Sequence, residues 1–147
     1  MIKRSLLALA ASLAITGTAV AGPNWLPIVI ADNGSSYLDW NFGSAVGDQM
    51  TVRLMRNYTD AVDLGADATT QEPLYAHRSV KVTYRVDCAK GTIAMDGWQM
   101  YSGNYGDGEL VWADRQAGTA AFLSPGSAEE KFAVVNACAA RSVLSMR

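Results

Sequence analysis

Hydrophobic and polar residues alternate most regularly between residues 78 and 88. From residue 79 onward the even positions are apolar and the odd positions are polar, with Val80, Val82, Tyr84, Val86 and Cys88 on one side and Ser79, Lys81, Thr83, Arg85 and Asp87 on the other. Successive side chains of a strand point to opposite faces. The pattern therefore predicts an antiparallel strand from His77 to Cys88, with one face on a core and the other in solvent.

Other strand and turn signals surround this segment. Asp32-Asn33-Gly34 predicts a hairpin turn, because asparagine and glycine adopt the left-handed angles that such turns require. Residues 40–45 are irregular, with room for one helical turn, and residues 59–76 predict a long acidic surface loop. The faces of 92–102 are mixed, as in a strand at a sheet edge or one covered on both sides. The other expected strands are 25–31, 36–39, 50–58, 92–102, 109–114 and a short one at 120–123.

The C-terminal segment has the pattern of a helix. Ser127 and Glu130 form a capping box, S-x-x-E, which marks a helix start. The helix is expected over residues 128–140. Its core face is expected to contain Phe132, Val135 and Ala139, with Val134 and Cys138 alongside. The fold class is therefore α+β: an antiparallel sheet of about six strands with one C-terminal helix packed on it.

The N-terminal residues are typical of a secretory signal peptide. Lys3 and Arg4 precede an apolar stretch over 6–20, and Ala19-Val20-Ala21 is an A-x-A cleavage site. The stretch is interrupted by polar residues and is shorter than the roughly 20 residues of a membrane span. We expect a signal peptide over 1–21 and one domain over 22–147. No cysteine follows the cleavage site, so no lipid anchor is evident, and the periplasm, the cell surface or secretion are the expected locations.

The net charge and the number of cysteines narrow the possible partners and the kind of cross-link in this protein. Removal of Lys3 and Arg4 changes the net charge from −2 to −4, which gives no basic surface for nucleic acid or anionic lipid. No second apolar run is long enough to span a membrane. The two cysteines, Cys88 and Cys138, both lie on core-facing stripes in an exported chain, so we expect one disulfide between them. Zinc is the alternative, but two thiols and the single His77 fall short of four ligands.

The sequence contains no recognisable catalytic or metal-binding set, and no cofactor is expected. His77 lies on the solvated side of its strand beside Arg78, so we interpret it as a surface histidine rather than part of a catalytic triad. No nucleophile elbow, phosphate loop or paired-histidine motif is present. Asp60, Asp63 and Asp67 invite a calcium interpretation, but their spacing differs from that of a calcium loop and favours a solvated acidic loop.

Aromatic residues near the glycine-rich segment 103–108 are candidates for partner binding. Tryptophan and tyrosine in sheets commonly pack in the core, and this is the alternative that applies most to Trp98 and Trp112. Tyr105 lies among glycines, where loops tend to be exposed, and an exposed aromatic can anchor a partner. The full candidate set is Tyr105, Tyr101, Trp98, Asp63 and Asp67.

Several short motifs along the chain resemble, in their order and spacing, those of the surface-adhesin protein E family of Gram-negative bacteria. They are Trp25, Asp32-Asn33-Gly34, Tyr37-Leu38-Asp39, Arg78 to Lys81, Tyr84 to Cys88, Tyr101-Ser102-Gly103, Gly106, Gly108, Pro125-Gly126-Ser127 and Cys138. The resemblance implies an exported antiparallel-sheet domain with a C-terminal helix and one disulfide. It also implies a surface lipoprotein that binds host extracellular-matrix and serum proteins and can form a homodimer. This chain departs in lacking the lipid-attachment cysteine and in its long acidic loop.

The sequence thus favours an exported, non-enzymatic, adhesin-like binding protein that engages protein partners such as host matrix or serum proteins. The alternative is a periplasmic accessory or inhibitor protein with an unidentified envelope partner. A small exported enzyme is a third hypothesis, and the missing catalytic residue sets argue against it.

Overall fold

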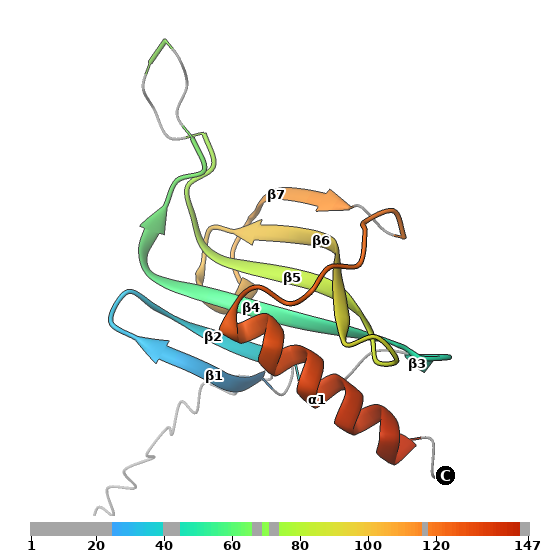
Figure 1. The fold of residues 1–147 in the computed structure, drawn as a ribbon. Coiled ribbons are helices and arrows are strands. Elements are labelled where there is room, and N and C mark those ends of the chain that lie inside the picture. The colour runs from blue at the N-terminus through green and yellow to red at the C-terminus, as the bar shows by residue number, and fades with distance from the viewer. Residues whose placement is uncertain (1–24, 40–44, 66–68, 71–73, 116–117, 145–147) are drawn as a thin grey trace, which may run out of the picture.

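The strands of this protein form one antiparallel sheet (Figure 1). The computed structural model describes residues 25–39, 45–65, 69–70, 74–115 and 118–144. In these residues the sheet has seven strands. Six lie side by side in the order β1 (Trp25–Ala31), β2 (Gly34–Asp39), β4 (Gln49–Val62), β5 (His77–Asp87), β6 (Thr92–Tyr101) and β7 (Leu110–Arg115). The two-residue β3 (Ala45–Val46) pairs with β4. The predicted sheet is confirmed, with β3 as an additional short strand.

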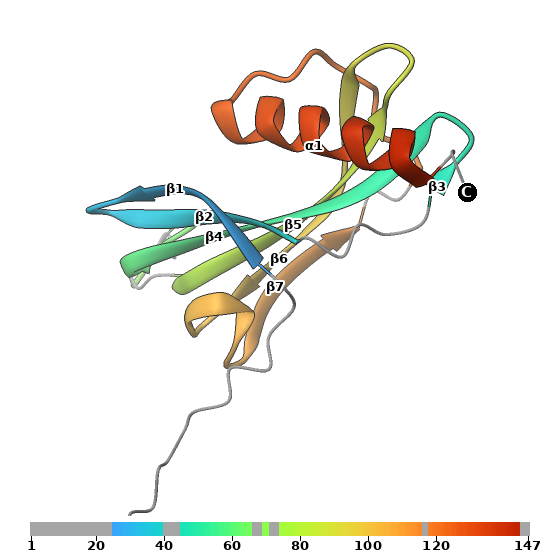
Figure 2. The ribbon, with the colours of Figure 1, turned by 90° about the horizontal axis from the view of Figure 1, so that it is seen from below.

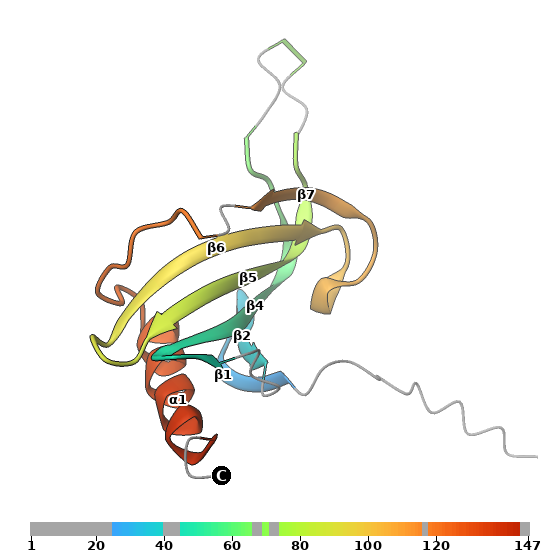
Figure 3. The same cartoon turned by 90° about the vertical axis from the view of Figure 1, so that its right-hand side faces the viewer.

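A single helix in the described residues, α1 (Ala128–Leu144), crosses one side of the sheet. Figures 2 and 3 show α1 on one side and the 3-10 turn η1 (Asn104–Gly106) on the other. The core lies between α1 and the sheet and consists of Leu38, Met50, Val52, Leu54, Val86, Ile93, Ala133, Val134 and Ala137. No helix in the described part of the chain combines the length and apolar character that crossing a membrane would require.

The predicted helix start and disulfide are both confirmed. The Ser127 hydroxyl accepts a hydrogen bond from the Glu130 N–H at 3.0 Å, and the Glu130 carboxylate accepts one from the Ser127 N–H at 3.1 Å. This reciprocal pair is the capping box. Cys88 and Cys138 form a disulfide with a Cα–Cα distance of 5.3 Å, which ties α1 to the end of β5.

The predicted core face of the helix was wrong in part. Ala133 and Ala137 are fully buried, whereas Val135 is 68% exposed and Ala139 is exposed. A core face that contains Val135 and Ala139 and one that contains Ala133 and Ala137 both satisfy the helical spacing of three and four residues. The small side chains at 133 and 137 let the helix backbone approach the sheet closely, so this side packs inward. The helix also continues to Leu144 rather than ending at residue 140.

The loop and strand boundaries also needed correction. β4 continues to Val62, which pairs with His77, so residues 59–62 belong to a strand rather than to the predicted loop. The expected strand at 120–123 is reduced to a single bridge between Leu123 and Ile93. Ala45 begins β3, while residues 40–44 lie outside the described residues. The mixed faces of β6 reflect a register shift, because Gly97 pairs with Thr83 and Met95 pairs with Tyr84, leaving Asp96 as an extra residue.

The predicted solvated face of β5 is partly covered. His77 is 3% exposed and Ser79 is fully buried, so the interpretation of His77 as a surface histidine was wrong. The His77 Nδ1 lies 2.8 Å from the Tyr75 backbone oxygen, and its ring packs edge-on against Tyr58. Ser79 is covered by η1, which folds back over this side of the sheet. Strand alternation alone contains no information about such a returning segment.

Candidate functional site

The connection between β6 and β7 closes on itself around η1. The Ser102 N–H donates to the Glu109 carbonyl at 3.0 Å, and the Gly103 N–H donates to the Asp107 carbonyl at 3.0 Å. Gly106 and Gly108 have φ angles of 70° and 79°, in the left-handed region that favours glycine. The glycine-rich segment therefore forms a closed turn with its own backbone hydrogen bonds.

Buried polar side chains from β4 and β5 hold this turn. The Ser79 hydroxyl donates to the Gly103 carbonyl at 2.6 Å and accepts from the Gly106 N–H at 2.8 Å. The Asn57 side-chain oxygen accepts from the Tyr105 N–H at 2.6 Å, and Asn57 is only 3% exposed. One hydroxyl and one amide thus fix three backbone groups of the turn.

Lys81 adds a third contact from β5. Its ammonium donates to the Gly106 carbonyl at 3.2 Å and lies 4.7 Å from the centre of the Tyr101 ring. Burial lowers the pKa of Lys81, and the nearby positive charge of Arg53 lowers it further. A Cβ at Gly106 would overlap the Lys81 side chain, so this position favours glycine for space as well as for its φ angle.

Tyr105 is held at the tip of the turn in a strained conformation. Its φ of 59° and ψ of 24° are left-handed, and it is the one non-glycine residue with positive φ among the described residues. A bulky residue rarely adopts these angles unless the surrounding structure imposes them. The side chain is 54% exposed, and its ring packs edge-on against Tyr37 with centroids 5.7 Å apart. A hydrogen bond with Tyr37 raises the pKa of Tyr105.

A small hollow lies beside Tyr105. Its volume is about 200 Å³, and it is lined by residues 30–31, 34–35, 57–59 and 104–105. None of these described lining residues is Asp, Glu, Lys, Arg or His. At Gly34 a Cβ would lie 2.2 Å from the Asn57 carbonyl oxygen, so only glycine lets β2 approach β4 this closely. We name Tyr105, Tyr37 and this hollow the turn site.

The other predicted binding residues do not gather at the turn site. Tyr101 is half-buried on the same side of the sheet, under Lys81. Trp98 pairs with Val82, on the side that carries α1, and packs against Trp112 with centroids 4.6 Å apart. Asp63 is exposed after the end of β4, and Asp67 lies outside the described residues.

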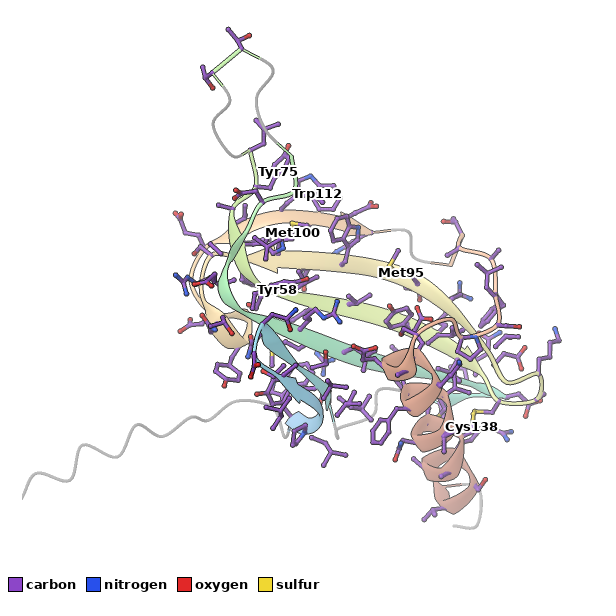
Figure 4. All side chains as sticks on the ribbon, turned by 60° about the vertical axis from the view of Figure 1, so that its left-hand side comes forward. Tyr58, Tyr75, Met95, Met100, Trp112 and Cys138 are labelled. Carbon is purple, nitrogen blue, oxygen red and sulfur yellow. A yellow bond between two sulfur atoms is a disulfide. The ribbon has the colours of Figure 1, made fainter. Side chains whose placement is uncertain are left out.

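Tyr75, Trp98 and Trp112 form an aromatic cluster, in which Trp112 contacts both of the other rings. Figure 4 shows Tyr75 and Trp112 where the β4–β5 connection leaves the sheet, with Cys138 at the opposite end. The cluster is half-buried and covers Met100, which is 1% exposed. These aromatics therefore extend the packing of the sheet beyond the helix.

A second hollow lies between the start of α1 and the sheet. It has a volume of about 210 Å³ and is lined by apolar β4 and β5 residues with Arg56 and Glu129 at its rim. Arg56 forms an ion pair with Glu129 at 3.0 Å. Burial and the neighbouring Glu130 raise the pKa of Tyr84 to about 12. The polar groups at this rim bind one another, so we favour the turn site as the functional candidate.

Comparison with known proteins places the chain in a family. The sequence profile described as surface-adhesin protein E matches residues 25–139. The chain belongs to the surface-adhesin protein E family. Protein E from non-typeable Haemophilus influenzae has a similar structure, with 15% sequence identity and a TM-score of 0.49, covering 77% of this chain and 72% of that chain. No curated protein matches the chain.

Membership in the surface-adhesin protein E family confirms the resemblance drawn from the sequence motifs and implies an exported or surface protein. Family membership is consistent with a domain that binds a partner rather than catalyses a reaction. Among the residues with described positions, no group of three His, Cys, Asp or Glu side chains could hold a metal ion.

Sequence reasoning selected Tyr105 but missed the residues that position it. Ser79 and Asn57 occur in strands at positions that alternation assigns to solvent. Their hydrogen bonds join residues 24 to 48 positions apart in the sequence, which no local pattern reports. Tyr37, which packs against Tyr105, entered the sequence analysis only as part of a family motif, and Tyr58, which lines the hollow, had no distinguishing signal beyond being aromatic.

Proposed function

We propose that this protein is an exported, non-enzymatic, adhesin-like binding protein that engages a protein partner through the turn site. Host extracellular-matrix or serum proteins are the partners that family membership favours. We further propose that residues 1–21 are a signal peptide and that 22–147 form the mature domain. The observation that carries the proposal is the exposed Tyr105 ring held on a strained, hydrogen-bonded backbone.

The energetic argument rests on preorganisation. A side chain that is fixed before binding loses little conformational freedom when a partner arrives, so more of its contact energy contributes to affinity. Tyrosine is also among the residues enriched at the energetic centres of interfaces. Tyr105 combines both properties, because Asn57 and Ser79 fix its backbone while its ring remains exposed.

The test compares an aromatic anchor with the acidic loop. The processed protein, exported from the full-length gene, is assayed against immobilised serum and matrix proteins. Tyr105→Ala should weaken binding by about tenfold or more, equivalent to about 1.4 kcal/mol. Asp63→Asn combined with Asp67→Asn should have the smaller effect. Val135→Ala, which shortens an exposed apolar side chain on α1, is the matched control.

Two results would contradict this assignment. Suppose that the double Asp variant binds the partner weakly and that its remaining binding no longer depends on salt, while Tyr105→Ala binds normally. Recognition is then electrostatic and lies on the acidic loop. If no serum or matrix protein binds, the adhesin-like function itself fails.

Location is tested separately by protease treatment of intact cells. Digestion of the protein supports display at the surface. Protection until the outer membrane is opened would favour the alternative, a periplasmic accessory or inhibitor protein.

A further inference from the structure

We propose that the hollow of the turn site binds a neutral saccharide unit, so that a glycoprotein partner is recognised through its glycan. This inference rests on the proposed function, because it names the ligand class of the same site. It is carried by the lining of the hollow, by a buried amide without a partner, and by the exposed Tyr105 ring.

The absence of charge at the hollow selects against anionic ligands. The described lining residues include no basic side chain that could pair with phosphate, sulfate or carboxylate groups. The nearby Arg78 guanidinium donates to the Thr59 backbone oxygen at 3.1 Å, which supports the wall of the hollow. A nucleotide, a sulfated glycan or a sialic acid would therefore lack its usual partner here.

The hydrogen-bonding groups at the hollow suit sugar hydroxyls. Asn57 is nearly fully buried, its side-chain oxygen is used by the Tyr105 N–H, and its side-chain nitrogen has no hydrogen-bond partner in the described structure. Because the oxygen faces an N–H donor, the orientation of this amide is fixed and the nitrogen remains a donor. This nitrogen has almost no exposed surface, so a ligand oxygen can accept from it only where the ligand displaces the turn above it.

Neighbouring side chains supply hydrogen-bond acceptors. The Thr59 hydroxyl donates to the Asp32 carbonyl at 2.9 Å, and the Ser35 hydroxyl donates to Tyr37 at 2.9 Å. Each oxygen therefore retains lone pairs that can accept from a ligand. The Asn104 amide donates once to the Tyr58 carbonyl at 3.3 Å and has a second N–H. A sugar hydroxyl, which both donates and accepts, matches this mixed set.

Size and aromatic content favour a sugar ring over an extended peptide. A hollow of about 200 Å³ is smaller than the roughly 300–1,000 Å³ of ordinary ligand pockets. It suits one ring-sized unit with the rest of the ligand in solvent. The C–H face of a pyranose packs well on an aromatic ring, and Tyr105 and Tyr58 both border the hollow.

The direct test is a titration of the ¹⁵N-labelled processed protein. The probes are methyl glycosides of neutral hexoses and N-acetylhexosamines at millimolar concentrations, with sialic acid and sulfate as anionic probes. At least one neutral probe should shift the Tyr105 backbone amide and the Asn57 and Asn104 side-chain amides in a saturable manner. If no neutral probe does so, or if the anionic probes bind there more tightly, the inference is wrong.

Variants keep the test independent of folding. Tyr105→Gly retains a residue suited to positive φ and removes the ring, and Thr59→Val removes one hydroxyl from an exposed side chain. Tyr105→Gly should weaken the sugar affinity by about tenfold. Val135→Ala should leave it unchanged. Equal affinity of Tyr105→Gly and the wild type would place the sugar elsewhere and overturn the inference.

A second experiment separates this inference from the proposed function. Serum glycoproteins that bind the protein are tested before and after enzymatic removal of their glycans. Loss of binding after removal supports the glycan inference. Equal binding of both forms, still weakened by Tyr105→Ala, leaves the proposed function intact and overturns the glycan inference in favour of a polypeptide surface. Saturable sugar binding without any glycoprotein binding would support the saccharide site but overturn its role in recognising a glycoprotein, and the proposed function would fail.

Discussion

Replacement of Ser79 by alanine should destabilise this protein far more than its place in an alternating strand suggests. The Ser79 hydroxyl is fully buried and satisfies both the Gly103 carbonyl and the Gly106 N–H, at 2.6 Å and 2.8 Å. An unsatisfied buried polar group costs about 1–3 kcal/mol. Both glycines are half-buried, so water can reach them in part and each of the two unpaired groups costs about 1–1.5 kcal/mol, near the lower end of that range. The expected loss is about 2–3 kcal/mol of unfolding free energy.

Urea denaturation measures this loss. With a slope of about 2 kcal/mol per molar urea, the midpoint should fall by about 1 M or slightly more. Ser102→Ala is the matched control in the same turn. Its hydroxyl is exposed and accepts one hydrogen bond, from the Glu109 N–H at 2.9 Å, so its loss should cost about 0.5–1 kcal/mol.

The comparison also has a functional readout. Because Ser79 positions the backbone on either side of Tyr105, Ser79→Ala should weaken partner binding although Ser79 is fully buried. The reasoning is refuted if Ser79→Ala lowers the midpoint no more than Ser102→Ala does. That result would mean that the turn holds its shape without the buried hydroxyl.

Three further predictions concern the rest of the fold. Because Cys88 and Cys138 are bonded, the native protein should have a mass about 2 Da below that of the reduced form. Reduction should lower the unfolding free energy by about 4 kcal/mol, since the two cysteines are 50 residues apart. Thiol labelling of both cysteines in the unreduced protein would contradict this. Ser127→Ala should lower the unfolding free energy by about 1 kcal/mol, and an unchanged denaturant midpoint would mean that the cap adds nothing. Burial and Glu130 raise the pKa of Tyr84 to about 12, so only the unfolded state loses this proton between about pH 10 and 12 and stability should fall across that window. Tyr84→Phe should remove this part of the fall, and ultraviolet titration in which every tyrosine ionises near its usual pKa would show that Tyr84 is not perturbed.

Local patterns in the sequence were sufficient for much of the scaffold. Alternation correctly assigned Val52 and Val86 to the core, because strand geometry alone decides which side chains share a face. The capping box located the helix start, because its hydrogen bonds join residues three apart. The disulfide followed from two cysteines on core-facing stripes of an exported chain.

Only the tertiary structure decided which polar positions are buried and which helix face packs inward. The spacing of α1 is compatible with a face centred on Val135 or on Ala133, and contact with the sheet selects the second. Ser79 and Asn57 are buried because a turn far along the chain folds over them. The same turn forces Tyr105 into a left-handed conformation. Local periodicity specifies how side chains divide between two faces of an element, but whether a face meets solvent depends on non-local contacts.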